Sequence, residues 1–192
     1  LARESVYLAL AFYNESRDWS LGLVVYDLQL GTLKESTLIS DNFIYYWDSN
    51  VFVEERYVEM DTTTTGQLIL TYPINAGSGD SNLAISLYNL NTNKVDYTYT
   101  YTNDFYDIWP LALNASNPSR SFIAFTKYDR NSDTPESVIL LFNYTNSLIE
   151  KVQEKTVELS AQTNFRCVGA TYDGQYYVLA VTSSSSLRLI SY

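Results

Sequence analysis

A short motif that occurs three times along the chain constrains the fold more than any other feature of the sequence. The segments LVVYDLQLGTL (Leu23 to Leu33), ISLYNLNTNKV (Ile85 to Val95) and ILLFNYTNSLI (Ile139 to Ile149) each end an apolar run with an aromatic residue followed by Asp or Asn. A polar turn comes next, and an aliphatic residue stands seven places after the aromatic. The closing residues LRLISY match the motif as far as its aromatic, Tyr192. The motif predicts a strand, a tight turn and the start of another strand.

The copies recur roughly every 50 to 60 residues, which is close to the length of one β-propeller blade. We therefore predict an all-β, β-propeller-like fold of repeated four-stranded antiparallel meander blades. The approximate units of this single domain are residues 1–41, 42–103, 104–160 and 161–192. The first unit lacks a first strand and the last stops in its third, so about three and a half blades are visible. Part of a larger propeller is the plainest interpretation, and a compact four-bladed ring is the alternative.

The composition agrees with a sheet protein. Tyr is common, at 18 residues, and no segment keeps a helical apolar period. The hydrophobic content of 46% is enough for a core. No run of about 18 apolar residues occurs, so we expect no transmembrane segment in this stretch. The sequence starts with neither an initiator Met nor a signal peptide, so we expect a mature chain or a fragment.

Charge and residue types exclude several classes of function. Histidine is absent from all 192 residues, which removes Ser-His-Asp catalysis, Cys-His catalysis and every His-based zinc or iron site. The net charge is −10 and the 12 Lys and Arg residues are dispersed, so we expect no nucleic-acid partner. The single cysteine, Cys167, excludes an internal disulfide. Its alternation with Phe165 predicts a buried, unreactive side chain.

The pairs Tyr26-Asp27, Tyr88-Asn89 and Phe142-Asn143 resemble the aromatic and acidic pair in the repeats of WD-repeat proteins and of bacterial or archaeal cell-surface propellers. WD repeats also carry a Gly-His pair, which this chain lacks, so the resemblance is to the surface group. It implies binding of protein or glycan partners, or assembly into a surface layer. We therefore expect a non-catalytic extracellular or cell-surface protein acting in binding or structural assembly, including self-assembly. An intracellular scaffold propeller and a propeller-type glycosidase are the alternatives.

Three sequons make the chain a candidate glycoprotein: Asn14-Glu15-Ser16, Asn114-Ala115-Ser116 and Asn143-Tyr144-Thr145. All three fall at predicted hairpin turns, where a glycan could be accommodated. The chain is rich in Asn, Ser and Thr, so a similar number of sequons would arise by chance.

Two further clusters have both a binding and a structural interpretation. Asp129, Asn131, Asp133 and Glu136 alternate through YDRNSDTPES and could supply oxygen ligands to Ca²⁺, the one cofactor considered. A solvated hairpin is the other interpretation, because no Gly follows the third candidate ligand. Tyr97, Tyr99 and Tyr101 share one face of the predicted strand VDYTYTYT. This ladder could stack on sugars or anchor a partner, or it could pack against the neighbouring blade.

The glycosidase alternative needs two carboxyl groups about 5 to 10 Å apart. The acids available before the first strands of two units are Glu54, Glu55, Asp104 and Asp107. We predict no catalytic residue among them. Trp109 is expected to fill the space between blades, and Trp19 and Trp47 have no predicted place.

Overall fold

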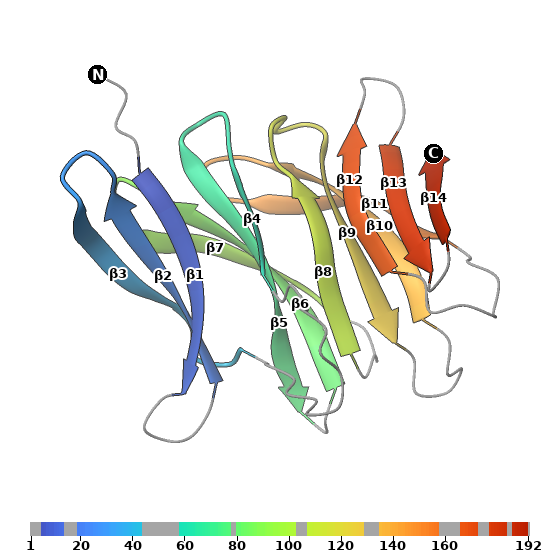
Figure 1. Ribbon diagram of the computed structural model, residues 1–192, viewed down its shortest axis with the longest axis horizontal. Helices are drawn as coiled ribbons and strands as arrows, with labels where there is room; N and C mark the ends of the chain where they lie inside the picture. Colours follow the sequence, from blue (N-terminus) through green and yellow to red (C-terminus); the bar gives the residue numbers. More distant parts are fainter. Residues whose placement is uncertain are drawn as a thin grey trace. The chain divides into compact units, whose positions relative to one another are not determined.

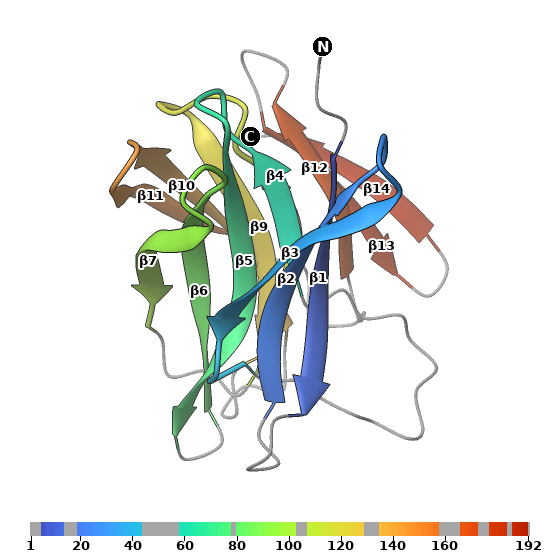
Figure 2. The same ribbon diagram turned by 90° about the vertical axis from the view of Figure 1, so that its left-hand side faces the viewer.

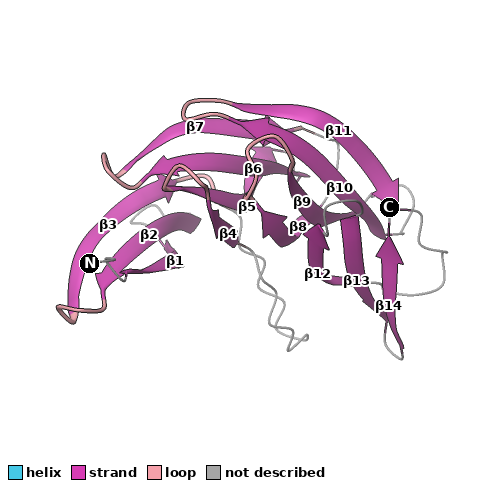
Figure 3. Cartoon of the chain, turned by 90° about the horizontal axis from the view of Figure 1, so that it is seen from above, coloured by secondary structure: helices cyan, strands magenta, loops and turns pink. Residues whose placement is uncertain are grey.

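The computed structural model describes residues 5–13, 19–43, 58–77, 80–102, 107–128, 135–157, 166–172, 177–183 and 186–191. These residues form β-strands joined by turns and loops, with no helix among them (Figure 3), so the all-β prediction is confirmed. It follows that these ranges contain no helix able to cross a membrane. The chain divides into two compact units, Leu1–Phe52 and Val53–Tyr192.

The first unit contains a three-stranded antiparallel sheet in the order β1-β2-β3, which we call the first sheet (Figure 1). Its strands are β1 (Ser5–Tyr13), β2 (Trp19–Asp27) and β3 (Thr32–Ser40). One face of the sheet is buried: Leu21, Leu23 and Val25 of β2 are at most 5% exposed.

The second unit contains three more antiparallel sheets, and within each one the strands lie side by side in chain order, as Figure 2 shows for β4 to β7. The second sheet consists of β4 (Glu59–Thr62), β5 (Gln67–Gly77), β6 (Asp80–Asn89) and β7 (Lys94–Tyr101). The third sheet consists of β8 (Asp107–Asn114), β9 (Ser121–Tyr128), β10 (Pro135–Tyr144) and β11 (Ile149–Val157). The fourth sheet consists of β12 (Arg166–Tyr172), β13 (Tyr177–Ser183) and β14 (Ser186–Ser191). The predicted four-stranded meanders are therefore present, while closure into a propeller stays a prediction.

The repeated motif forms the same turn in the first and second sheets. The Oδ1 atom of Asp27 accepts hydrogen bonds from the next-but-one and following backbone N–H groups at 2.9 and 3.0 Å. Asn89 does the same at 2.9 and 3.3 Å. Four residues after each of these, the chain takes a left-handed conformation, at Gly31 (φ 64°) and Asn93 (φ 55°). Asp or Asn follows the aromatic because its side chain satisfies the turn's backbone donors.

A bulge accompanies every copy of the motif. The strand pairing shifts immediately before Tyr26, Tyr88 and Phe142, so that each following strand carries one extra residue. After the shift, Tyr26 pairs with Leu33 and Tyr88 with Val95, the aliphatic residues seven places on. The third copy departs from this rule.

In the third sheet the turn is longer. Phe142 pairs with Lys151, and Ile149, which stands seven places after Phe142, pairs with Tyr144. The lengthened turn closes with a hydrogen bond of 2.8 Å from the N–H of Thr145 to the carbonyl of Leu148. The same sequence spacing thus gives a different cross-strand partner, because two more residues lie between the aromatic residue and its neighbour.

The core of the second unit lies between the second and third sheets. Residues of one face of the second sheet, among them Ile69, Ile85 and Leu87, form one cluster with Leu140 and Phe142 of the third. All five are at most 1% exposed. The alternation predicted for β7 is confirmed, because its odd-numbered tyrosines turn toward this cluster and its threonines are exposed.

The turn geometry predicts the effect of substitutions at Gly31. We expect Gly31→Ala to destabilise the first unit by about 1 kcal/mol, because a side chain costs that much in the left-handed region. Space is not the reason, since an added Cβ would lie 3.8 Å from the Tyr26 hydroxyl, an ordinary contact. Gly31→Asn serves as the control and should cost little, because Asn93 occupies the same place in the second sheet. Urea unfolding measures both, and equal losses would contradict the explanation.

Candidate functional site

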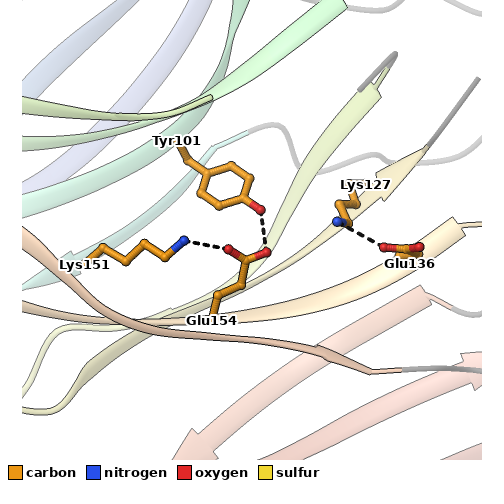
Figure 4. Close-up of polar contacts among 5 residues, drawn as sticks. All are labelled: Tyr101, Lys127, Glu136, Lys151 and Glu154. Atoms are coloured by element: carbon orange, nitrogen blue, oxygen red, sulfur yellow. Dashed lines mark hydrogen bonds and ion pairs between the residues drawn. The ribbon is translucent and has the colours of Figure 1, made fainter. Parts of the chain in front are cut away.

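A polar cluster joins the outer strands of the second and third sheets (Figure 4). The Tyr101 hydroxyl, at the end of β7, donates a hydrogen bond of 2.6 Å to Oε1 of Glu154 on β11. The other carboxylate oxygen, Oε2, accepts one of 2.7 Å from Nζ of Lys151. The Lys151 ammonium also lies 5.5 Å from the centre of the Tyr101 ring, within cation–π range. The Glu154 carboxylate therefore accepts hydrogen bonds from one residue of each sheet, Tyr101 of the second and Lys151 of the third.

The Tyr101 side chain is fixed on its apolar side as well. It is 3% exposed, and its ring meets that of Phe125 edge to face, with the centroids 5.1 Å apart. The contact thus combines an apolar ring, a polar tip and a charged acceptor. Such a residue is suited to linking two packed sheets.

A second ion pair lies in the same region (Figure 4). Nζ of Lys127, on β9, is 3.0 Å from Oε2 of Glu136 on β10. The Lys127 side chain is only 8% exposed, so the pair offsets part of the cost of burying its charge.

The electrostatic balance at Glu154 has opposing contributions. Partial burial raises the pKa of its carboxyl, but the hydrogen bonds from Lys151 and Tyr101, and the charges of Lys151 and Lys127, together lower it further than burial raises it. The pKa of Glu154 is therefore lower than usual, and the carboxylate is charged near neutral pH.

Two more polar contacts tie the same two sheets together. Oδ2 of Asp61, on β4, accepts a hydrogen bond of 2.7 Å from the N–H of Ala115. The carbonyl of Ala115 accepts one of the same length from the Tyr144 hydroxyl. Nε2 of Gln67, at the start of β5, donates to the carbonyl of Asn146 at 3.0 Å. The loop between β8 and β9 and the turn between β10 and β11 are thus both held to the second sheet.

A chain of three hydroxyl groups, two of them buried, connects three strands of the second sheet. The Tyr72 hydroxyl is 2.8 Å from Oγ of Ser86, which is 2.8 Å from Oγ1 of Thr98. Burial raises the pKa of the Tyr72 phenol, against the opposing effect of its hydroxyl partners. The chain links β5, β6 and β7 through neutral groups.

The predicted tyrosine ladder lies at the contact between the sheets. Tyr97 and Tyr99 are half-buried and pack against the core cluster, and Tyr101 belongs to that cluster. This is the packing arrangement that the sequence left open beside a binding role. Binding of a partner by Tyr97, Tyr99 or Tyr101 stays a prediction.

The sequons differ in their surroundings. Asn14 lies outside the described residues. Asn114 is half-buried at the end of β8, and its Oδ1 accepts hydrogen bonds from the hydroxyl of Ser116 at 2.7 Å and from the N–H of Ser116 at 3.2 Å. Oδ1 of Asn143 is buried and has no hydrogen-bond partner among the described residues. The structure therefore distinguishes two sequons that look alike in the sequence.

Most of the other candidate residues lie outside the described part of the chain. Asp129, Asn131 and Asp133 of the calcium candidate do so, and Glu136 is paired with Lys127. The described ranges contain no group of three acidic or cysteine side chains placed to hold a metal ion. The remaining residues whose side chains are not described are Glu54, Glu55, Asp104, Asp107, Trp47, Trp109 and Cys167.

Sequence reasoning identified Tyr101 but missed three charged residues of these contacts, namely Lys127, Glu154 and Asp61. Burial of Lys127 could have been predicted, because this residue stands two places after Phe125 and therefore lies on the same face of β9 as a buried aromatic side chain. Glu154 and Asp61 carried no such signal, since each lies in a strand with other polar residues. No protein-family model and no curated protein matches this chain, so its function is inferred from this geometry.

The geometry of Glu154 predicts a pH-dependent contribution to stability. We expect Glu154→Gln to destabilise the second unit by about 1 to 2 kcal/mol at pH 7, because a charged acceptor is lost from two hydrogen bonds. The pKa is lowered on folding, so this contribution is present above pH 4.5, the ordinary value, and is lost as the pH falls through the lower folded value.

Urea unfolding between pH 7 and pH 3 measures the difference between the variant and the original protein. The difference should shrink below pH 4.5. Glu150→Gln, at an exposed position of the same strand, is the matched control and should change little throughout. A difference that stays constant to pH 3 would mean that the carboxylate charge is not what stabilises the contact.

Proposed function

We propose that this chain is a non-catalytic β-propeller-type protein of the cell surface or extracellular space, which acts by binding protein or glycan partners or by assembly. The observation that carries the proposal is the face-to-face packing of the second and third sheets, which are successive copies of one repeat. A protein built from repeated sheets presents strand edges, turns and flat faces to partners, and packed side chains fill its interior.

The order of contacts between sheets supports the propeller interpretation. Strand β8, the first of the third sheet, contacts β4, β5 and β6, and β12 contacts β8 and β9. The outermost strands β7 and β11 also contact each other. The first strands of neighbouring sheets thus lie near each other, and so do the outermost strands. This is the relation expected for neighbouring blades around an axis.

The roles of the described acids support the non-catalytic interpretation. Glu154 and Asp61 accept hydrogen bonds across the contact between sheets. Asp96 accepts one from Asn89 at 2.9 Å, and Asp27 caps a turn. Each of these carboxylates has a structural partner, whereas a glycosidase needs a pair aimed at a substrate.

Location and activity can be tested together on protein from its native source. Cells are treated with a protease that cannot enter them, and the chain is followed with an antibody. Loss of the chain supports a surface location, and its survival until lysis favours the intracellular scaffold. Hydrolysis of a panel of aryl glycosides, abolished by amide substitution of any of Glu54, Glu55, Asp104 or Asp107, would refute the non-catalytic proposal.

A surface or secretory route also predicts where a glycan is attached. When the chain is secreted from a glycosylating host, we expect a glycan at Asn114 and none at Asn143. In Asn114 the sequon hydroxyl already contacts the amide, and its Ser116 is exposed. The Oδ1 atom of Asn143 is buried in the folded sheet.

Peptide mapping by mass spectrometry reads the occupancy of each site. Asn114→Gln should remove the glycan, and Asn117→Gln, at an exposed position in the same loop, should leave it in place. Occupancy of Asn143 alone would show that the folded surroundings of the sequon do not decide modification.

A further inference from the structure

Two buried hydroxyl groups lie opposite each other on neighbouring strands of the third sheet. Oγ1 of Thr126 on β9 and Oγ of Ser137 on β10 have no hydrogen-bond partner among the described residues. The two residues are 3% and 4% exposed. They are direct partners in the antiparallel pairing of β9 and β10, so both side chains point to the same face of the sheet.

This face of the third sheet is otherwise apolar around the two hydroxyls. Phe122 and Ala124 of β9 and Ile139 of β10 share the face and are at most 3% exposed. Burying a hydroxyl in such surroundings is unfavourable unless it forms a hydrogen bond, and nearly all buried polar groups in proteins form one. Thr126 and Ser137 therefore call for a partner that can satisfy both of them.

The charged neighbours of these residues in the sequence cannot be that partner. Lys127 and Glu136 each stand next to one of the two hydroxyl residues, so their side chains point to the opposite face of the sheet. There they form an ion pair with each other at 3.0 Å. The partner is therefore a neutral group that can both donate and accept.

Comparison with the second sheet agrees with space for a small molecule at this place. Ser137 stands five places before Phe142, as Leu83 stands five places before Tyr88, the equivalent aromatic residue of the motif. Leu83 is fully buried, so the second sheet fills this position with a large apolar side chain. The serine of the third sheet is smaller, and it presents a hydroxyl where the leucine has methyl groups.

The geometry of a directly opposed pair suits a bridge by a single water molecule. The Cβ atoms of such a pair lie about 4.5 to 5.5 Å apart. A water about 2.8 Å from each of two hydroxyl oxygens spans a gap of up to about 5.5 Å. Buried waters typically occupy polar sites of this kind, where they bond to two or more groups that otherwise have no partner.

We infer that Thr126 and Ser137 bind one buried water molecule between them. Strand β12 of the fourth sheet contacts β9, and the second sheet covers the other face of the third. The water therefore belongs to the side of the third sheet that faces the fourth. This site goes beyond the proposed function and does not depend on it.

Urea unfolding of the whole chain tests the inference through the sign of a substitution. Thr126→Val keeps the shape of the side chain but removes the hydroxyl. We expect the equilibrium constant for unfolding to rise about fivefold, because the water loses a partner and Ser137 loses the water. Ser137→Ala should have a similar effect. The double variant should unfold less readily than the two separate effects multiplied together, since both changes remove the same water.

A high-resolution crystal structure of the whole chain identifies the partner directly. We expect a water within hydrogen-bond distance of Oγ1 of Thr126 and Oγ of Ser137. It should be present in Thr126→Ser, the matched control that keeps the hydroxyl, and absent from Thr126→Val.

Three results would overturn the inference. The first is unchanged or increased stability of Thr126→Val, which is the result for a hydroxyl that has no partner to lose. The second is a double variant whose effect equals the product of the single ones. The third is a crystal structure in which the two hydroxyls bond to each other or to another side chain.

Discussion

The apolar contact between the second and third sheets is the interaction on which the rest of the second unit depends. Ile85 and Leu87 on one side, and Leu140 and Phe142 on the other, are all inaccessible to water. Burying one aliphatic or aromatic side chain of this size contributes about 1.5 to 3 kcal/mol, and this contact buries several of them. The polar contacts of Tyr101, Asp61 and Gln67 form at the margins of this contact, so they align sheets that apolar packing already holds together.

The second sheet shows how much packing one sheet can support. All residues of β5 from Gln67 to Pro73 are buried, on both faces of the sheet. The sequence of such a strand is a nearly continuous apolar run, as in QLILTYPI. A strand with one solvent-exposed face instead alternates between apolar and polar residues. The outer strand β7 alternates cleanly, because only one of its faces is covered. The burial of a strand can thus be estimated from its residues before its neighbours are known.

The strands could be predicted from the sequence, and the contacts between sheets could not. Turn residues and alternation placed the strands nearly as the structure has them, since a turn such as DLQLG depends on local conformation alone. The Tyr101–Glu154 contact joins residues far apart in the chain, and nothing in KVQEKTV distinguishes Glu154 from its charged neighbours. The sequon at Asn114 was predicted by its pattern, but the difference from Asn143 depends on which side chains surround each one.

The longer turn of the third sheet has a consequence for how a repetitive chain folds. Its two additional residues bring Lys151 opposite Phe142, and Glu154 then stands where the other sheets have the hydroxyls of Ser36 and Thr98. Sheets with one pattern of apolar residues could otherwise stack in any order, a common source of misfolding in repeat proteins. The charged acceptor binds the hydroxyl of Tyr101 in the preceding sheet, and this contact favours the correct neighbour. The irregular copy of the repeat therefore favours one neighbour, the second sheet, over the others.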